Sequence, residues 1–280
     1  DFHVSGGNLL TRWTRTLDED NQYSVQFYYD RLERHSTATA FAEDRDTLDF
    51  DFQHSFRPLE RHRITWGFGY RYIEDFLTPA SFYLQFDPAK RADDLFSYFV
   101  QDEITLVEDR WHFIAGCKFE HNDYTGFEYQ PTGRLLWTPS ERYTIWGAVS
   151  RAVRTPSRAE ADLDDYPVLL GIYPGPLPSF ALVSGDPEIE SEKMMAYEIG
   201  IRGQPRQEVF WDFTVFFNDY DDIAAWRAGS PALGGLPGGW PAVLTPAWFA
   251  RGADAQTYGF EIAADYQFAA DWKLRGGYSF

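Results

Sequence analysis

The feature that most constrains the fold of this chain is an alternation of apolar and polar side chains with a period of two residues. From Leu48 to Phe56, one parity carries Leu, Phe, Phe, His and Phe, and the other carries Asp, Asp, Gln and Ser. Because successive side chains of a β-strand point to opposite faces, this pattern predicts strands with one apolar and one polar face. It recurs in about twelve segments of roughly 10–14 residues, and no convincing amphipathic helix lies between them.

The lengths and connections of these segments indicate a membrane barrel. A globular strand has about 5–6 residues, whereas a tilted strand that crosses a bilayer needs about 9–11. Short polar turns occur at 17–21, 57–62, 107–110, 138–142, 203–207 and 269–271. Between them lie mostly longer connections, at 36–44, 76–91, 155–192 and 220–254, although the one near 124–126 is short. Short turns on one rim and long loops on the other are typical of bacterial outer-membrane barrels.

Aromatic residues give a second, independent indication. They make up 18% of the chain, and on the apolar parity they stand beside one short turn after another. A soluble sheet would hold its core aromatics in mid-strand, whereas a membrane barrel carries aromatic girdles at the bilayer interfaces. We assign to this girdle Tyr23, Trp111, Trp137, Tyr143, Trp211 and Trp272. The expected fold is therefore all-β, a transmembrane antiparallel up-and-down β-barrel.

Charge and cysteine usage exclude several function classes. The formal net charge of -18 argues against a nucleic-acid partner, which needs a basic surface. The single cysteine, Cys117, excludes an internal disulfide and a cysteine-based zinc site. A mean hydropathy of -0.43 argues against a helical membrane protein. The first residues, DFHVSGGNLL, lack the basic and apolar regions of a signal peptide, so we expect a mature protein or an internal piece of a longer one.

No motif for covalent chemistry stands out. The six histidines show no metal-ligand spacing and no recognisable pairing with Cys117. GFGYRY (67–72) lies inside an alternating strand, and the Gly-rich segment 229–241 lacks the lysine of a phosphate loop. The acidic runs 43–46 and 162–165 suit solvated surface charge better than a calcium site. We expect no enzyme, no cofactor and no bound metal.

Four segments resemble the barrel of TonB-dependent outer-membrane receptors. They are YFVQDEITL (98–106), QPTGRLLWTPSERYTIWGAVSRAVRTPSR (130–158), IESEKMMAYEIGIRGQ (189–204) and TYGFEIAADYQFAADWKLRGGYSF (257–280). The most specific phrase is SRAVRTPSR, followed after a long loop by ESEKMMAYEIG, and the resemblance extends from about Gly7 to Phe280. It implies a barrel of about twenty-two strands, an N-terminal plug and a short box that contacts the energising protein TonB. Since neither plug nor box is visible, we interpret residues 1–280 as a partial barrel domain, a middle portion of a receptor.

The polar parity is expected to form a wet wall of the lumen, packed against the plug through water and ion pairs. For any single residue, this role is favoured over direct ligand contact. The residues assigned to it are Glu128, Arg134, Glu198, Arg202 and Glu261. Asp102 breaks the pattern because its parity is otherwise apolar, and a partner on a neighbouring strand is the one explanation at hand.

Ligand contact is expected from the long loops and the lumen rim. The residues assigned to it are Arg154, Arg158, Tyr173, Phe180, Tyr220, Trp226, Arg227, Trp240, Trp248 and Arg251. Aromatic faces with a few arginines suit a bulky, anionic, partly aromatic metal chelate, and packing of the loops against themselves is an equal alternative. Arg151 and Arg154 stand three apart and so point to opposite faces. We predict that Arg151 faces lipid near the edge of the apolar band and Arg154 faces the lumen.

The resemblance implies an energised receptor in the outer membrane of a Gram-negative bacterium, which moves a scarce nutrient chelate into the periplasm. A ferric siderophore comes first, and cobalamin or another metal complex second. The other implied partners are membrane lipid, lipopolysaccharide and a TonB-type energising protein that binds through the absent N-terminal region. Two alternatives stay open: a passive porin-like or adhesin-like barrel and, less favoured, a soluble carbohydrate-binding β-protein.

Overall fold

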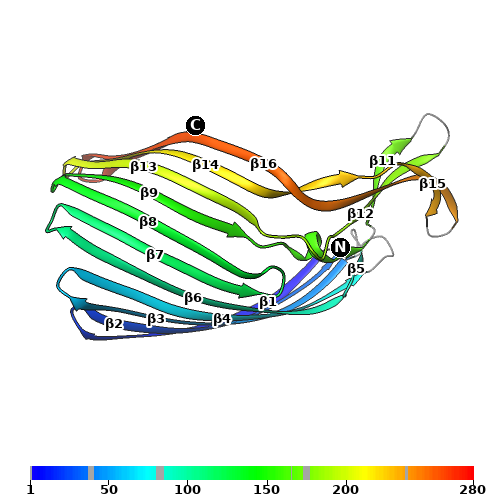
Figure 1. Cartoon of the computed structure of the whole chain (residues 1–280), viewed down its shortest axis with the longest axis horizontal. Coiled ribbons are helices and arrows are strands. Elements are labelled where there is room, and N and C mark those ends of the chain that lie inside the picture. Colours follow the sequence, from blue (N-terminus) through cyan, green and yellow to red (C-terminus); the bar gives the residue numbers. More distant parts are fainter. Residues whose placement is uncertain (1, 37–40, 80–84, 165, 173–176, 237–238) are drawn as a thin grey trace.

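The computed structural model describes residues 2–36, 41–79, 85–164, 166–172, 177–236 and 239–280. In this part of the chain, twelve long strands pair in sequence order, each antiparallel to the next, and curve into an open trough (Figure 1). They are β1 (Phe2–Asp18), β2 (Asn21–Ser36), β3 (Phe41–Leu59), β4 (His62–Pro79), β6 (Lys90–Val107), β7 (Trp111–Asn122), β8 (Gly126–Ser140), β9 (Tyr143–Arg154), β13 (Glu192–Arg206), β14 (Val209–Ala228), β16 (Trp240–Ala269) and β17 (Trp272–Ser279). Among the described residues, β1 pairs only with β2 and β17 only with β16, so no closure of the barrel is seen.

The two rims of the trough differ as the sequence predicts. The six predicted short turns lie at one rim, on the left of Figure 1, and the longer connections lie at the other, together with the short β7–β8 turn. The short elements belong to the loop rim: β5 (Gln85–Phe86), α1 (Arg158–Asp162), β10 (Leu163–Asp164), β11 (Tyr166–Ile172), β12 (Pro178–Ser184) and β15 (Ala232–Leu236). None of the helices among the described residues has the length and apolarity needed to cross a bilayer.

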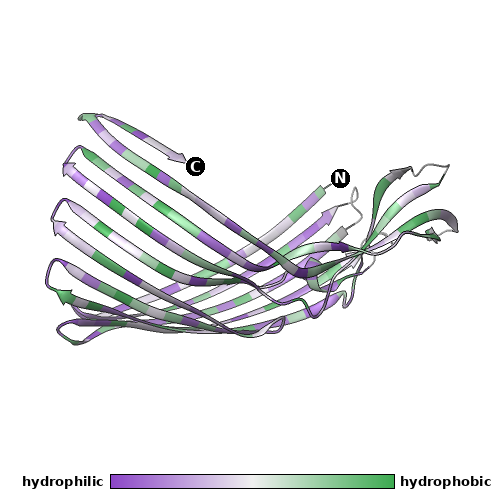
Figure 2. Ribbon diagram, turned by 45° about the horizontal axis from the view of Figure 1, so that its top comes forward, coloured by the Kyte–Doolittle hydropathy of each residue, from purple (hydrophilic) through white to green (hydrophobic). Residues whose placement is uncertain are grey.

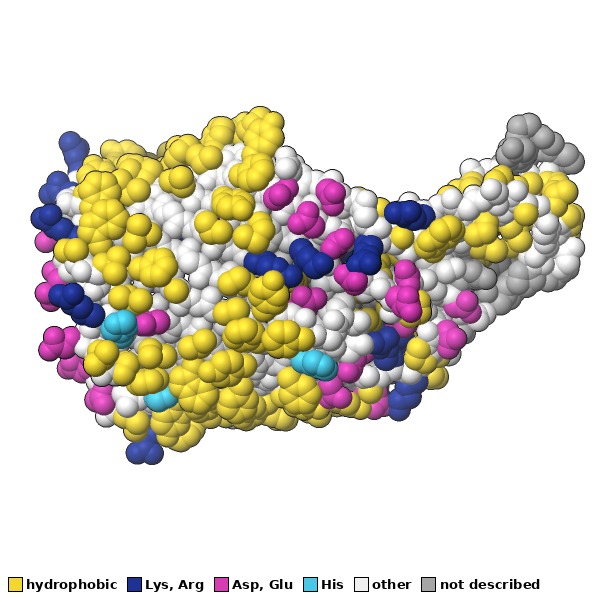
Figure 3. All heavy atoms as spheres, viewed as in Figure 1, with side chains coloured by type: hydrophobic (Ala, Val, Ile, Leu, Met, Phe, Trp, Pro, Cys, Tyr) yellow, Lys and Arg dark blue, Asp and Glu magenta, His cyan; other side chains and the backbone are white. Residues whose placement is uncertain are grey.

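The two faces of the sheet differ in polarity. Apolar side chains cover the outer face of the strands (Figure 3), and the colours of Figure 2 alternate along each strand. On this face Ile199 is 68% and Tyr258 is 73% exposed. A soluble monomer rarely exposes a contiguous apolar surface of this extent. The outer face is therefore the lipid-facing surface of an outer-membrane barrel.

The assigned girdle residues lie on this outer face, next to the short-turn rim. Trp111 and Trp137 are stacked with ring centroids 5.5 Å apart, and Tyr143 and Trp211 lie 6.4 Å apart. At the two lateral edges of the sheet, Trp13 packs edge-on against Tyr23, and Trp272 packs near Phe268. The position suits an interfacial belt, and the contact of these rings with headgroups stays a prediction.

The segment 220–254 was predicted as a long loop, and strands β14 and β16 continue through most of it; its extracellular position stays a prediction. They pair as far as Ala228 and Ala247, and β15 pairs with β16 beyond them. Two register shifts lie between Tyr220 and Ala225, and Asp222 has a φ of 60°. A β-bulge adds a residue to one strand and so breaks the alternation of period two. The strands also vary in length more than predicted, from 8 residues in β17 to 30 in β16.

Asp102, the exception on the apolar parity, has the expected partner on the neighbouring strand. His62 Nδ1 of β4 lies 2.7 Å from Asp102 Oδ2 of β6, and each side chain is about one-third exposed. The pair sits close to the short-turn rim, since His62 is the first residue of its strand. It gives a polar side chain on the lipid-facing surface a local hydrogen bond, which such a surface requires.

We expect His62→Ala to destabilise the barrel by about 1–3 kcal/mol, because it leaves the Asp102 carboxylate unpaired. The double variant His62→Leu/Asp102→Leu should recover most of that loss, since two apolar side chains suit this face. Urea unfolding of the receptor refolded in lipid vesicles measures both values. Equal losses in the single and the double variant would show that the pair contributes nothing.

A small hydrophobic cluster ties the loops together. Leu163, Val183 and Ala247 are buried, and Phe86, Ala181 and Phe249 pack against them. These residues come from β5, β10, β12 and β16, which belong to three different connections. β12 runs parallel to β16 over residues 243–248, and β11 adds to its edge. We call β11, β12, β15 and the paired loop-rim ends of β14 (223–228) and β16 (240–253) the arm, which projects to the right in Figure 1.

Candidate functional site

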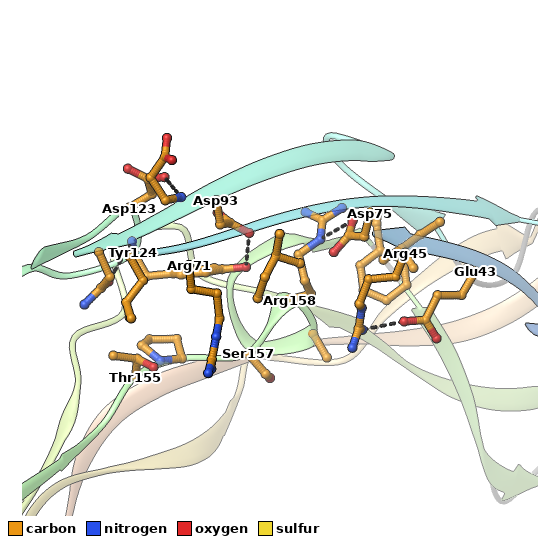
Figure 4. Close-up of a pocket in the computed structure, with 18 of the residues that line it drawn as sticks. Glu43, Arg45, Arg71, Asp75, Asp93, Asp123, Tyr124, Thr155, Ser157 and Arg158 are labelled. Carbon is orange, nitrogen blue, oxygen red and sulfur yellow. Dashed lines mark hydrogen bonds and ion pairs between the residues drawn. The ribbon is translucent and has the colours of Figure 1, made fainter. Parts of the chain in front are cut away.

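A cavity of about 570 Å³ opens on the concave face at the loop rim (Figure 4). Its walls come from β2, β3, β4, β6, the β7–β8 turn and residues 155–159. Below it lies a second cavity of about 410 Å³, and Arg71, Leu95 and Thr155 line both. Together they form a polar recess where the lumen meets the loops. We take this recess as the candidate site.

The recess is roofed by residues 155–164, which we call the strap. The strap leaves β9 at Arg154 and ends by pairing with β5, where Leu163 lies opposite Phe86. In the sheet, β9 is separated from β4 by β8, β7 and β6, so the strap crosses the inner side of these three strands. This crossing sets the strap above the two cavities.

The strap folds as the short helix α1 because its sequence carries a capping box. The Ser157 side chain accepts a hydrogen bond from Glu160 N, and the Glu160 carboxylate accepts one from Ser157 N at 2.8 Å. Such reciprocal bonds satisfy backbone donors that a helix start leaves free. The sequence analysis expected a loop here, and the Ser-x-x-Glu spacing at 157–160 is the signal that it missed.

Arg158 anchors the strap to the barrel wall. It is 12% exposed; its Nε lies 3.2 Å from Asp75 Oδ1 of β4, and its Nη1 donates to Asp162. Its Nη2 donates to Pro88 O at 2.7 Å. The assignment of Arg158 to ligand contact is untested, and in this arrangement its guanidinium is already engaged by partners within the chain.

Arg91 of β6 holds the strap from below. Its Nη1 lies 3.0 Å from both oxygens of Asp162, and its Nε lies 2.5 Å from Asp93 Oδ1. The guanidinium also stacks over the ring of Tyr124, 4.0 Å from its centroid. Burial raises the pKa of Tyr124, whose hydroxyl donates to Asp93. This phenol is therefore a neutral donor at the wall of the recess.

Arg154 joins the two ends of the 155–192 connection. Its Nη2 lies 2.6 Å from Glu160 Oε1 and 2.6 Å from Glu192 Oε1, and Glu192 is its cross-strand neighbour. The hydrogen bonds from Arg154 lower the pKa of Glu160 to about 2 and also lower the pKa of Glu192. Arg154 lines the smaller cavity, so it faces the lumen as predicted.

These ion pairs predict a pH dependence for the strap. The pKa of Glu160 is lower in the folded state than its ordinary value of 4.5. The stabilisation is therefore present above that value and is lost as the pH falls toward 2. A spin label at Ala159 should stay immobile from pH 7 to 5 and gain mobility below about 4. Glu160→Gln should be mobile throughout; a label equally immobile at pH 3, or in Glu160→Gln at pH 7, would contradict this.

The sequence predicted solvated surface charge for the acidic runs, and this is wrong for one residue of each run, whereas Asp164 is exposed as predicted. Glu43 is 3% exposed and Asp162 is 6% exposed, and both pair with arginines. Glu43 accepts from Arg45 and lies 3.6 Å from Arg34. Glu43 and Asp162 are buried because of their positions: Glu43 lies at the loop end of β3 and Asp162 lies in the strap, and both of these segments border the recess. Among the described residues, no group of three His, Cys, Asp or Glu side chains is arranged to hold a metal ion.

The aromatic loop residues lie elsewhere, in or next to the arm. Trp226 packs on Phe249 with ring centroids 3.9 Å apart, and Trp240 is 72% exposed. Arg251 pairs with Glu190 instead of facing the recess. The remaining members are Phe180 on β12, Tyr220 and Arg227 on β14, and Trp248 on β16; Tyr173 lies outside the described residues. Of the nine described residues assigned to ligand contact, Arg154 and Arg158 alone line either cavity.

The residues assigned to the lumen wall all lie on the concave parity. Arg202 pairs with Asp212 at 3.2 Å, and Arg134 stacks over Trp146 at 4.8 Å. The Glu261 carboxylate accepts a hydrogen bond from the Ser279 hydroxyl, and Glu198 lies opposite Ala148 on β9. Glu128 is 8% exposed, and its Oε2 lies 3.8 Å from Arg151 Nη2. Arg151 itself reaches over the ring of Tyr129 on the outer face. Contact of this wall with a plug stays a prediction.

Sequence reasoning missed several residues of the recess. They are Arg34, Arg45, Asp75 and Asp93, near the loop ends of their strands, and Tyr124 in the β7–β8 turn. The alternation through Asp49 and Arg71 continues to Arg45 and Asp75, because β3 begins at Phe41 and β4 ends at Pro79. The predicted loops at 36–44 and 76–91 concealed that continuation. The recess offers ion pairs, a phenol and apolar walls, which suit non-covalent binding.

Comparison with known proteins agrees with this architecture. The family model described as "TonB dependent receptor-like, beta-barrel" matches residues 3–280. No curated protein sequence matches the chain. Among solved structures, the siderophore receptor PirA from Acinetobacter baumannii is 13% identical with a TM-score of 0.68, covering 100% of this chain and 53% of that one.

Two further solved structures resemble this chain to a comparable degree. A mutant of the ferric enterobactin receptor PfeA from Pseudomonas aeruginosa, in complex with enterobactin, is 16% identical with a TM-score of 0.74 and covers 100% and 44% of the two chains. The FrpB iron transporter from Neisseria meningitidis is 14% identical with a TM-score of 0.68, covering 99% and 43%. The chain thus spans about half the length of these structures, and at these identities the likeness shows the fold.

Proposed function

The chain belongs to the TonB-dependent receptor β-barrel family, and from this premise we propose that it forms part of a receptor that takes up a ferric siderophore. The recess under the strap carries this proposal, because it places a polar cavity of about 570 Å³ where the lumen meets the loops. A ligand bound there stands at the entry to the barrel. Structural neighbours named as siderophore receptors and an iron transporter support iron as the cargo.

No covalent step is needed for this function. The family consists of non-enzymatic transporters, and the recess holds its ligand through hydrogen bonds, ion pairs and apolar contact. Release into the periplasm would be driven by a TonB-type protein that acts through a region outside this chain. The lipid-facing surface meets membrane lipid and, at the loop rim, lipopolysaccharide. Cobalamin or another metal complex is the second cargo.

The two alternatives from the sequence are less well supported. A passive porin needs an open mouth, whereas the strap crosses the inner side of three strands at the loop rim. A soluble carbohydrate-binding protein would not present an outer face with Ile199 and Tyr258 about two-thirds exposed or more. An adhesin-like barrel would bind its partner through the exposed arm. Such a barrel would not transport a ligand, so an uptake assay separates it from the proposed receptor.

Growth of a deletion strain tests the proposed function. Cells that lack the receptor should fail to grow on at least one ferric siderophore as sole iron source, and the full-length receptor should restore growth. The same strain on cobalamin-dependent medium tests the second cargo. Equal growth of deletion and parent strains on every iron source and on cobalamin would reject the proposal.

A further inference from the structure

The charge of the recess bears on which chelate it can accept. Six basic and eight acidic side chains belong to the residues that line the two cavities. Fourteen charged groups in one recess could still bind an anion if the basic ones were free. What decides the selectivity is therefore the pairing of each cation.

Every basic lining residue already has a carboxylate within ion-pair distance. Arg71 Nε lies 2.6 Å from Asp49, and Lys118 Nζ lies 2.9 Å from Glu120. Arg34 and Arg45 share Glu43. Arg154 and Arg158 are the strap contacts described above, and each of them has two carboxylate partners.

Several of the partner carboxylates come from outside the cavity walls. Glu160, Asp162 and Glu192 pair with Arg154 and Arg158 but do not themselves line either cavity. With these three carboxylates and Arg91, which pairs with Asp93 and Asp162, the acidic side chains in and next to the recess still outnumber the basic ones. The local field at the recess is thus negative, and it lies within a chain of net charge -18. An anion entering here meets this field and finds no unpaired guanidinium among the described residues.

From this balance we infer that the receptor takes a chelate of neutral or positive net charge, such as an uncharged ferric complex or one with a pendant ammonium. The inference rests on the proposed function and names the substrate class of the same site. It replaces the sequence expectation of an anionic, aromatic chelate, since the aromatic residues and arginines behind that expectation lie mostly in or next to the arm. The carboxylates of the recess favour cations by ordinary Coulomb attraction.

A thiol probe tests the field without knowledge of the natural ligand. Ala159→Cys places an exposed thiol in the larger cavity, and Ser140→Cys places one at the opposite rim, where Glu141 and Arg142 balance. Both are made in the full receptor, purified in detergent, with all other cysteines including Cys117 replaced. We measure labelling rates with a cationic and an anionic methanethiosulfonate reagent of similar size.

The ratio of cationic to anionic labelling should be about fivefold higher at residue 159 than at 140 at low salt. It should approach the control ratio near 1 M salt, where the Debye length is about 3 Å. A ratio at 159 equal to or below the control at low salt would overturn the inference.

A matched series of ligands tests the selectivity itself. The probes are one ferric trihydroxamate with a pendant ammonium, its N-acetylated form and its N-succinylated form, which carry net charges of about +1, 0 and -1. We expect the first two to compete for receptor binding about fivefold better than the third. An anionic form that binds as well as the cationic one would refute the inference even if growth assays support siderophore uptake. If no member of the series binds, the labelling ratio decides the charge question and the growth assay separately decides the function.

Discussion

Replacing Arg158 by alanine is expected to free the strap from the barrel wall and to weaken chelate binding at least tenfold, while the barrel stays folded. The variant removes the Arg158 partner of Asp75 and leaves Asp162 with Arg91, and these carboxylates belong to residues that are 3% and 6% exposed. Removing one partner of a buried ion pair costs about 3–5 kcal/mol. Because the strap can move away to hydrate both carboxylates, the loss falls on strap docking.

Limited proteolysis between residues 155 and 191 measures strap docking, and heat-modifiable gel migration reports whether the barrel is intact. Arg142→Ala, in the turn between β8 and β9 at the other rim, is the matched control. It should change neither the rate of proteolysis nor the heat-modifiable gel migration. Arg158→Lys should rescue little, because an ammonium cannot reproduce the paired contacts of the guanidinium. If Arg158→Ala resists protease as the parent does, the strap is held by other contacts and this account of it is wrong.

The second large effect concerns two neighbouring residues on opposite faces of β13. Ile199 faces lipid and is 68% exposed, whereas Glu198 lies on the concave parity opposite Ala148. Ile199 stands seven residues from the turn at Arg206, close to the middle of an apolar band about 25 Å tall. Ile199→Arg should therefore destabilise the barrel by about 2–4 kcal/mol.

Glu198→Arg is the matched control, because it adds the same side chain one residue away on the wet face. It should change stability by less than about 1 kcal/mol. Unfolding in urea after refolding into lipid vesicles measures both variants. If the two variants lose equal stability, Ile199 does not face lipid and Glu198 does not face the lumen. The interpretation of the alternating pattern as membrane-spanning strands would then be wrong as well.

The fold was largely predictable because strand faces are a local property of the sequence. The alternation revealed all twelve long strands and the two unlike rims. It failed at 220–254, where the bulges around Asp222 shift the parity, and at 157–162, where a helix of one turn is too short for a helical period. The Ser157–Glu160 spacing was a local signal for that helix, but it is common enough to be overlooked.

The site was predictable only in part, because it depends on contacts between distant segments. Arg154 and Arg158 were found from their place beside the long connection. Their partners were not, since Arg158 meets Asp75 only after the strap crosses three strands. The aromatic residues of 219–252 pointed to a binding loop, but they lie on strands that carry them away from the recess. Sequence spacing cannot show which rim residues a long loop covers.

We propose that this barrel belongs to a receptor that moves a ferric chelate inward at the expense of cellular energy. Uptake of a radioactive ferric siderophore that supports growth, in cells with and without the energising protein, measures this directly. We expect surface binding in both strains, with accumulation inside the cell only when the energising protein is present and the membrane is not uncoupled. Accumulation that is equal without energisation would identify a passive barrel and contradict the claim.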